Sequence, residues 1–382
     1  MRVAVPWIAG TAWLGGWNYF LNMARVCRRF APDIEFALLC EGELEPAFRA
    51  ELAAEKIALL PPVPLRRQGY VKGYLGLQDR ATQTLLRDAG IAAVFELIPL
   101  RTRYGIPALA WIPDFQHRRL PAFFPRRERL RRDLIYRTRL RLNRHAMLSS
   151  HAALEDMQAF IPKPRAQVHI VPFAVLLTEE ITSACIADAL KHHSLPPVYF
   201  FLPNQFWQHK NHEVALRALA LAVKQIPSTM LALSGQAVDV RASGYAAGLM
   251  QLANDLGISA NLRILGTISH KDLLVLTAGA HALVNPSLFE GWSTTVEEAK
   301  ALGTPMILSD LDVHREQAAS DAVYFPRSSP QALAEALVEA MRAPIANTEP
   351  RRAYANLRAQ ENCRVYAQKL RAALAATVAD GI

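Results

Sequence analysis

Apolar residues along the chain gather into short runs that end at glycine, proline or polar residues, and helical stretches separate these runs. Such runs are typical of strands in a parallel sheet that is buried on both faces. In the first half they cover residues 2–8, 34–40, 91–97, 107–113, 145–150 and 168–173. In the second half they cover residues 198–203, 229–235, 261–266, 281–286, 305–310 and 322–326. This alternation predicts an α/β fold made of two Rossmann-like, doubly wound domains.

The uncharged stretch over residues 3–24 has the length of a membrane span or a signal peptide. Helix-breaking and polar residues interrupt it at Pro6, Gly10, Gly15, Gly16, Asn18 and Asn22. We therefore predict a strand over residues 2–8, a turn at Gly15 and Gly16, and a helix over residues 18–30.

Changes in the pattern predict how the chain is divided. The parts are an N-terminal domain (1–175), a linker (176–196), a C-terminal domain (197–345) and a helical tail (346–382). Tyr366, Leu370, Ala373 and Leu374 repeat at helical spacing, so we expect a C-terminal helix that packs back on the body. Two doubly wound domains that face each other form a cleft at the carboxyl ends of their strands, where ligands bind.

Composition agrees with a soluble globular protein of two domains, because 382 residues exceed what one core usually fills and 51% of them are hydrophobic. The four cysteines form no CxxC pair, which predicts neither a disulfide framework nor a zinc site and favours the reducing cytoplasm. Residues 1–175 contain 26 Lys or Arg against 15 Asp or Glu, whereas the remainder contains 17 against 19. The basic excess therefore belongs to the first half alone.

The basic residues concentrate in residues 125–145, where nine arginines accompany two acids. Leu130, Leu134 and Ile135 can share an apolar stripe on a helix in this segment. A basic amphipathic helix suits an anionic membrane surface, which predicts peripheral membrane contact through Arg126–Arg144. A solvated helix face is an equally ranked alternative, and nucleic acid is disfavoured because no nucleic-acid motif accompanies the arginines.

Three glutamates follow the predicted strand over residues 281–286, in the sequence LFEGWSTTVEEAKALGTP. Glu290 lies in the loop at the carboxyl end of that strand, which predicts that it faces the cleft. Thr294 and Glu297 have the spacing of a capping box, in which each side chain accepts a hydrogen bond from a backbone N–H. Glu298 then lies in the first turn of a helix that ends at Gly303.

The start of this helix is also suited to an anion, because the N–H groups from Ser293 to Val296 have no partner within the helix. Carboxylates such as those of Glu290 and Glu298 accept hydrogen bonds from hydroxyls. A ligand that carries hydroxyls at two places and phosphate beside them fits this set of groups. The sequence therefore predicts a nucleotide sugar as the ligand.

The segment NPSLFEGWSTTVEEAKALGTPMILSD resembles the signature of the retaining glycosyltransferases of family 4, in which seven residues separate two glutamates. LPNQFWQHKNHEVALRALA and ILGTISHKDLLVLTAGAHALVNPS resemble other segments of that family, in the same order. The resemblance covers most of residues 197–325, and in the first half it extends only to the Gly15-Gly16 turn and WIPDFQH. It implies a nucleotide-sugar-binding C-terminal domain and an acceptor-side N-terminal domain.

By this resemblance Glu298 binds the ribose hydroxyls of the donor, and Glu290 contacts the hydroxyls of the sugar ring near the reacting carbon. Lys210 neutralises the diphosphate as it leaves. Backbone groups are expected to bind the sugar, the diphosphate and the base at Gly291, Trp292, Ser293, Thr294 and Gly266.

In the first half, Gly16 is expected to let the backbone approach the diphosphate, since glycine has no side chain to block it. His117, in WIPDFQH, corresponds to a histidine that lies near the sugar carbon and the acceptor in the family. Asp114 is its expected orienting partner.

One departure from the family concerns the phosphate site. The family usually has an arginine about six residues before the lysine, and Asn204 or Gln205 occupies that place here. An amide can still donate hydrogen bonds to phosphate, but it carries no charge. Thr295 also replaces a proline that is common within the glutamate motif.

These features predict a hexosyltransferase that needs neither metal nor cofactor and uses a nucleoside diphosphate sugar and a glycan or lipid-linked acceptor. The family resemblance implies that the reaction retains the configuration at the anomeric carbon. Synthesis of cell-surface polysaccharide or lipopolysaccharide, at the inner face of the membrane, is the expected setting. The alternatives are a nucleotide-sugar epimerase or sugar-phosphate synthase of the same architecture, and an inactive sugar-nucleotide binder. A dehydrogenase is disfavoured because no GxGxxG follows the first strand.

Overall fold

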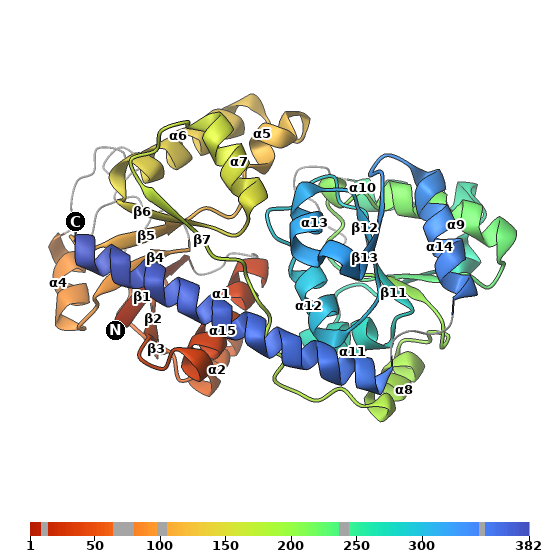
Figure 1. Ribbon diagram of the computed structural model, residues 1–382, viewed down its shortest axis with the longest axis horizontal. Coiled ribbons are helices and arrows are strands. Elements are labelled where there is room, and N and C mark those ends of the chain that lie inside the picture. Colours follow the sequence, from red (N-terminus) through yellow and green to blue (C-terminus); the bar gives the residue numbers. More distant parts are fainter. Residues whose placement is uncertain (9–13, 64–79, 98–104, 237–243, 344–347, 382) are drawn as a thin grey trace. The chain divides into compact units, whose positions relative to one another are not determined.

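The computed structural model describes residues 1–8, 14–63, 80–97, 105–236, 244–343 and 348–381, which form two compact units (Figure 1). The first unit comprises residues 1–115, 126–176 and 362–382, and the second comprises residues 116–125 and 177–361. Each unit contains one sheet in which all described strand pairs are parallel. The predicted α/β class with two doubly wound sheets is confirmed.

The first sheet has the strand order β3-β2-β1-β4-β5-β6-β7. Its strands are β1 (Arg2–Ile8), β2 (Glu35–Glu41), β3 (Ala58–Leu59), β4 (Ala93–Glu96), β5 (Ala108–Trp111), β6 (His145–Leu148) and β7 (Gln167–Ile170). The helices of this unit are α1 (Leu14–Phe30), α2 (Pro46–Ala54), α4 (Arg80–Asp88), α6 (Arg126–Leu142), α7 (His151–Phe160) and the last part of α15 (Glu349–Asp380). All six predicted strands of this half are present, and the short edge strand β3 adds a seventh.

The second sheet has the strand order β10-β9-β8-β11-β12-β13. Its strands are β8 (Phe200–Leu202), β9 (Leu231–Leu233), β10 (Leu262–Ile264), β11 (Ala282–Asn285), β12 (Met306–Ser309) and β13 (Ala322–Phe325). The α-helices of this unit are α5 (Gln116–Arg119), α8 (Ser183–His192), α9 (His212–Gln225), α10 (Tyr245–Asp255), α11 (His270–Gly279), α12 (Thr294–Leu302), α13 (Asp312–Ala318), α14 (Pro330–Arg342) and the first part of α15. The 3-10 helices are η1 (Pro121–Phe123), η2 (Gln208–Lys210), η3 (Ser259–Asn261) and η4 (Ala319–Asp321).

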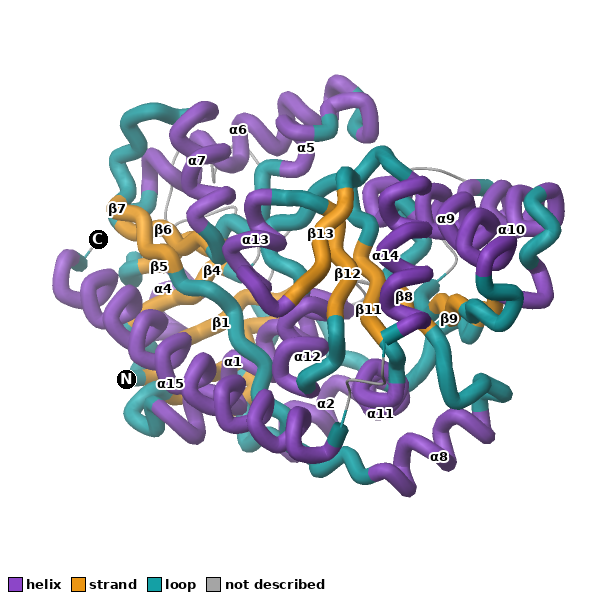
Figure 2. The backbone as a smooth tube through the Cα atoms, turned by 45° about the vertical axis from the view of Figure 1, so that its right-hand side comes forward, coloured by secondary structure: helices purple, strands orange, loops and turns teal. Residues whose placement is uncertain are grey.

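Alternate residues of the second sheet pack on opposite faces, which explains why its strands are apolar throughout. Phe200 and Leu202 join a buried cluster with α9, α10 and α14, while Phe201 joins another with α8 and α11. Helix α9 packs against α14, as Figure 2 shows. Helices α12 and α13 contribute to a further cluster with Leu283 and Leu308 of the sheet. Burial on both faces thus fixes the strand ends that carry the candidate site.

The C-terminal helix is present as predicted, and the four residues of its expected apolar face are all buried. In the first unit, the end of α15 is held by hydrogen bonds to β6 and to Arg144, the residue that precedes β6. Asp380 pairs with Nε2 of His145 at 3.0 Å, and its carbonyl oxygen accepts a hydrogen bond from Arg144. Arg371 forms an ion pair with Asp33 at 2.9 Å. The tail therefore belongs to the packed body.

Two expectations about the chain path change. Gly15 and Gly16 do not form a turn, because both lie in the first turn of α1; the connection over residues 9–13 lies outside the described residues. The segment over residues 176–196, predicted as a linker, contains helix α8, and its residues from Leu177 onward belong to the second unit. Thr182 caps that helix by accepting a hydrogen bond from the N–H of Cys185. Within the described parts of the chain, no helix is both long and apolar enough to cross a bilayer.

Candidate functional site

The strand order of the second sheet reverses between β8 and β11, which are hydrogen-bonded neighbours. In a doubly wound sheet, connections leave in opposite directions at such a point and open a crevice at the carboxyl ends of the two strands. The connection after β8 contains Lys210, and the connection after β11 contains Glu290. Both lie where the sequence analysis expects ligand-binding side chains.

Lys210 and Glu290 form an ion pair, with Nζ 2.7 Å from Oε1. Their side chains are 13% and 9% exposed, so the pair is largely shielded from water. Ser287 donates a hydrogen bond of 2.6 Å to the same carboxylate oxygen. The backbone N–H of Leu288 donates to the carbonyl oxygen of His209 at 2.7 Å, which joins the two connections directly.

Burial raises the pKa of Glu290, but nearby positive charge, above all that of Lys210, and the hydrogen bond from Lys210 lower it to about 2. Glu290 is therefore a carboxylate at neutral pH. Such a group accepts hydrogen bonds from hydroxyls and stabilises positive charge beside it. The ion pair with Lys210 thus keeps Glu290 ionised and fixes the position of its carboxylate.

His314 extends this cluster from α13 and is completely buried. Its Nδ1 lies 2.8 Å from the carbonyl oxygen of Ser309, so Nδ1 donates the hydrogen. Burial lowers the pKa of His314, although the charge of Glu290 opposes this. The neutral ring then has its lone pair on Nε2, which has no hydrogen-bond partner among the described residues.

Helix α12 starts beside the ion pair and carries the second predicted carboxylate. Glu298 is 7% exposed, and its Oε1 lies 2.8 Å from Nε2 of His270, the first residue of α11. Glu298 is the fifth residue of the helix, so it lies beyond the first turn where we expected it. The helix ends as predicted at Gly303, which adopts the left-handed conformation with φ 69°.

The predicted capping box is wrong. Ser293, rather than Thr294, is the N-cap residue, and no side chain caps this helix. Glu297 is buried and instead pairs with Lys300 at 2.9 Å and with Nε2 of Gln317 at 3.0 Å. Gln317 reaches the helix start from α13, so its role depends on tertiary packing. The structural role predicted for Glu297 stays, with different partners.

Gln317 also changes the expected set of backbone donors. The N–H of Ser293 donates to Oε1 of Gln317 at 3.2 Å, so this group is occupied rather than open to a ligand. Thr294 is exposed, whereas Gly291 and Trp292 are half-buried. The N–H groups at Thr294 and the following residues face the open end of the helix. The expected anion site therefore begins one residue later than predicted.

The place of the missing arginine is filled by a buried amide, Asn204, and a half-buried one, Gln205. Asn204 is 4% exposed, and its Nδ2 has no hydrogen-bond partner among the described residues. Gln205 accepts a hydrogen bond of 2.8 Å from the N–H of Gln236. Gly235, with φ 142°, lets the chain before Gln236 pass close to Asn204, because a Cβ at Gly235 would lie 2.5 Å from the carbonyl oxygen of Asn204. The two amides thus differ, since Gln205 is already engaged.

Gly266, predicted near the base, lies in the connection after β10 with φ 66°. Its carbonyl oxygen accepts a hydrogen bond of 2.8 Å from the N–H of Gly235. The connections after β8, β9 and β10 therefore contact one another in sequence. This arrangement places Gly266 on the same edge of the sheet as the residues described above.

The residues predicted in the first half of the chain are largely buried. Gly16 is buried in the first turn of α1, within the first unit. His117 is completely buried in α5 and packs edge-on against Phe124, with ring centroids 6.4 Å apart. Asp114 is half-buried just before this helix. The proposed roles of these residues stay predictions.

Sequence reasoning missed four polar residues of this site: Ser287, His270, His314 and Gln317. Each touches or faces a predicted residue through tertiary packing, and none has a local spacing that marks it. No group of three or more His, Cys, Asp or Glu in the described ranges is arranged to hold a metal ion.

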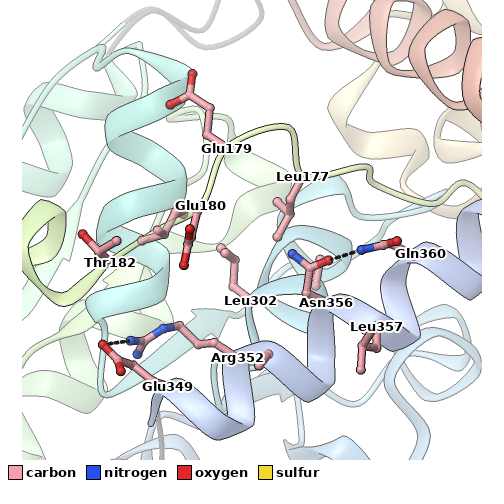
Figure 3. A pocket seen from close by; sticks show the side chains of 13 residues that line it. Leu177, Glu179, Glu180, Thr182, Leu302, Glu349, Arg352, Asn356, Leu357 and Gln360 are labelled. Atoms are coloured by element: carbon pink, nitrogen blue, oxygen red, sulfur yellow. Dashed lines mark hydrogen bonds and ion pairs between the residues drawn. The ribbon is translucent and has the colours of Figure 1, made fainter.

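A cavity of about 570 Å³ lies elsewhere in the second unit (Figure 3). It is bounded by the segment 177–182, by Leu302 at the end of α12, and by Arg352 and Asn356 of α15. None of the predicted donor-binding residues lines it. Helix α12 has nine residues, so its two ends are about 12 Å apart, and the cavity lies at the end opposite Thr294.

Comparison with known proteins agrees with this geometry. Residues 189–360, just under half of the chain, match the family described as Glycosyl transferases group 1. A curated relative, the O-antigen chain mannosyltransferase RfbU of Salmonella typhimurium, is 30% identical over 129 residues. The alignment spans 33% of this chain and 33% of that protein, so it covers only a third of the relative's own length.

Solved structures extend the similarity of fold to nearly the whole chain. Anabaena Alr3699/HepE in complex with UDP and glucose has a TM-score of 0.72 at 15% identity and covers 98% of this chain and 100% of that chain. WaaG, a glycosyltransferase involved in lipopolysaccharide biosynthesis, has a TM-score of 0.62 at 16% identity, with coverages of 97% and 98%. These likenesses establish the fold, with its two sheets and C-terminal helix.

Acid sensitivity tests the state of Glu290. Because folding lowers the pKa of Glu290 from 4.5 to about 2, the carboxylate stabilises the folded protein above pH 4.5, and this stabilisation is lost as the pH falls toward 2. The loss from this group between pH 6 and pH 3.5 is about 1 to 2 kcal/mol. Thermal unfolding midpoints of Glu290→Gln should therefore fall less over this range than those of the wild type.

Glu339→Gln is the matched control for this experiment, since Glu339 is an exposed glutamate of the same unit. It should follow the wild-type pH profile. Equal slopes for Glu290→Gln and the wild type would contradict the low pKa of Glu290.

Proposed function

We propose that this chain is a retaining glycosyltransferase of family 4 that transfers a hexose from a nucleoside diphosphate sugar to a hydroxyl of a glycan or lipid-linked acceptor. The observation that carries the proposal is the shielded ion pair of Lys210 and Glu290 at the switch point of the second sheet, beside the start of α12. Glu298 lies farther along the same helix. Such a set provides one cation for a diphosphate and two carboxylates for hydroxyls.

In the proposed complex the diphosphate lies between Lys210 and the open end of α12, where the helix dipole also favours negative charge. Glu290 accepts hydrogen bonds from hydroxyls of the sugar, and Glu298 accepts them from the ribose. Lys210 must then leave its contact of 2.7 Å with Glu290 to reach the phosphate. On donor binding, Lys210 thus exchanges Glu290 for the diphosphate, and Glu290 exchanges Lys210 for hydroxyls of the sugar.

The proposed reaction breaks the bond between the anomeric carbon and the diphosphate oxygen and forms a bond to the acceptor oxygen. The acceptor proton passes to the departing phosphate oxygen. Lys210 and the helix start stabilise the negative charge that develops there, in a site with little access for water. No carboxylate nucleophile is assigned below the sugar, so we favour attack on the same face as the leaving group, which retains the configuration. His117 is the proposed contact to the sugar carbon and acceptor.

The proposed setting is synthesis of a cell-surface polysaccharide or lipopolysaccharide, in the cytoplasm at the inner face of the membrane. Two similarities support this setting, because RfbU is an O-antigen chain mannosyltransferase and WaaG is a glycosyltransferase involved in lipopolysaccharide biosynthesis. Independence from metal is part of the proposal, because Lys210 and the backbone donors supply the electrostatic role that a metal has in other transferases.

An inactive sugar-nucleotide binder is a second candidate, and the missing arginine favours it. Asn204 and Gln205 carry no charge, so Lys210 is the cation proposed for both phosphates. The buried Nδ2 of Asn204 supplies at most a neutral hydrogen bond. Binding of donor without turnover is what this candidate requires.

Helix α6 supports a proposed contact with an anionic membrane surface. Leu130 and Leu134, one turn apart, are 59% and 49% exposed, so apolar side chains accompany the arginines on the outside of the helix. Ile135 is buried, which removes it from the predicted stripe. Arg139 is also buried and pairs with Glu96 at 3.1 Å, so it belongs to the core rather than to this surface.

Binding of donor nucleotides can be tested by thermal shift in the absence of metal, with UDP, GDP, dTDP, ADP, CMP and their common sugars. A ligand that binds only the folded state raises the unfolding midpoint. One nucleotide should stabilise the wild type selectively, and Glu298→Ala should lose most of that effect. Glu339→Ala should keep it. Stabilisation that survives in Glu298→Ala would contradict the ribose role, and binding without product formation would favour the inactive binder.

Vesicle binding tests the α6 surface. Replacing Arg126, Arg127, Arg131 and Arg132 by Gln should weaken binding to vesicles rich in phosphatidylglycerol at least tenfold, since each basic residue near an anionic surface contributes about 1 kcal/mol. Arg131 and Arg132 already pair with Glu128, so they contribute less than that.

The matched control replaces four exposed basic residues of the second unit, Lys191, Arg217, Lys224 and Arg263. This control has the same net charge, so it should keep wild-type binding. Equal losses in both variants would show a general effect of charge and would contradict a specific α6 surface.

A further inference from the structure

His270 is the described side chain that holds the carboxylate of Glu298. Its Nε2 lies 2.8 Å from Oε1, and because a carboxylate can only accept, Nε2 carries the hydrogen. The Glu298 side chain is 10% exposed and that of His270 is 46% exposed. Ion pairs with such an exposed member contribute little to stability, so the contact has little value for folding alone.

The hydrogen bond from His270 occupies one oxygen of the Glu298 carboxylate, Oε1. Oε2 accepts no hydrogen bond from any residue in the described ranges, although the carboxylate as a whole is shielded from bulk water. A shielded carboxylate with one fixed oxygen is an oriented acceptor. The ring of His270 prevents rotation that would exchange the two oxygens.

The backbone that carries these two side chains is itself fixed. Ser269 caps α11 by accepting a hydrogen bond of 3.0 Å from the N–H of Asp272. Helix α11 packs against α12, and Thr304, just after α12, donates a hydrogen bond of 2.8 Å to the carbonyl oxygen of Thr277 in α11. The distance between His270 and Glu298 is therefore set by the packing of two helices and does not depend on a flexible loop.

The connection before His270 is the one proposed to contact the base. It runs from β10 through Gly266, which is hydrogen-bonded to Gly235, and Leu265 donates a hydrogen bond of 2.8 Å to the carbonyl oxygen of Leu233. His270 thus lies along the chain between the proposed base contact and the carboxylate proposed for the ribose. A nucleoside is the part of the donor that spans these two places.

We propose that His270 is a positioning residue that orients Glu298 toward the vicinal 2′- and 3′-hydroxyls of a ribonucleoside diphosphate. The inference rests on the proposed donor site and adds a specificity to it. Both hydroxyls of a ribose can donate to an oriented carboxylate, whereas a 2′-deoxyribose offers one donor fewer. The site therefore selects ribonucleotides over 2′-deoxyribonucleotides, and His270 sets how strongly.

The test measures dissociation constants by calorimetry for UDP and 2′-deoxy-UDP, and for GDP and 2′-deoxy-GDP. The wild type should prefer the ribonucleotide about tenfold or more, as expected for a hydrogen bond to a charged group. His270→Ala should reduce this ratio severalfold, and His270→Gln, whose amide can donate in the same place, should restore most of it.

His193→Ala is the matched control, because His193 pairs with Asp272 at the start of the same helix and has no contact with Glu298. It should keep the wild-type ratio. A general loss of helix stability would lower affinity for both nucleotides and would leave the ratio unchanged. The ratio thus separates orientation of the carboxylate from a purely structural effect.

Two results would overturn the inference, and they differ in what else they affect. If Glu298→Ala abolishes the preference but His270→Ala keeps it, the inference is wrong and the donor site stands. If neither UDP nor GDP binds the wild type, or if Glu298→Ala leaves the preference intact, the proposed donor site is wrong and the role of His270 fails with it.

Discussion

A positive and a negative side chain that are largely shielded from water must neutralise each other, and the second sheet is arranged around that constraint. Lys210 and Glu290 lie 80 residues apart in sequence and meet at 2.7 Å because β8 and β11 are neighbours at the switch point. Removing either partner alone would leave a shielded charge without its counter-charge, which is strongly destabilising. The surrounding groups, Ser287 and the backbone of His209, hold the pair in place.

The same pair gives a physical reason for donor binding. A diphosphate can replace Glu290 as the partner of Lys210, and sugar hydroxyls can replace Lys210 as the partner of Glu290. The charges are then desolvated before the ligand arrives, so binding does not have to remove their water. Helix α12 adds its unpaired N–H groups and Glu298, and its far end is fixed by the left-handed Gly303.

The strands could be predicted from the sequence because they are buried on both faces and therefore uniformly apolar. The end of α12 could be predicted because glycine adopts the left-handed conformation that terminates a helix. The capping box could not be judged locally, since the N–H of Glu297 donates to the carbonyl oxygen of Ser293 and Gln317, 20 residues after Glu297, donates to the Glu297 carboxylate. A spacing of three residues indicates which local hydrogen bonds are possible, but it does not show which residues distant in sequence bond to the same groups.

The candidate site shows the same limit. The glutamates and Lys210 could be identified from their positions after predicted strands and from the family resemblance. The contact between Lys210 and Glu290 depends on the order of the strands in the sheet, which the local sequence patterns do not predict. His270 and His314 depend on how α11 and α13 pack against α12 and on the buried environment, so no local pattern marks them.

The central claim is that Lys210 exchanges Glu290 for the diphosphate of the donor. The most direct measurement is the dissociation constant of UDP or GDP, whichever binds the wild type, for Glu290→Gln and Lys210→Met. Glu290→Gln should bind the nucleotide severalfold more tightly, because Lys210 no longer has to leave a carboxylate, and Lys210→Met should bind it more weakly. Equal or weaker binding by a folded Glu290→Gln would contradict the exchange.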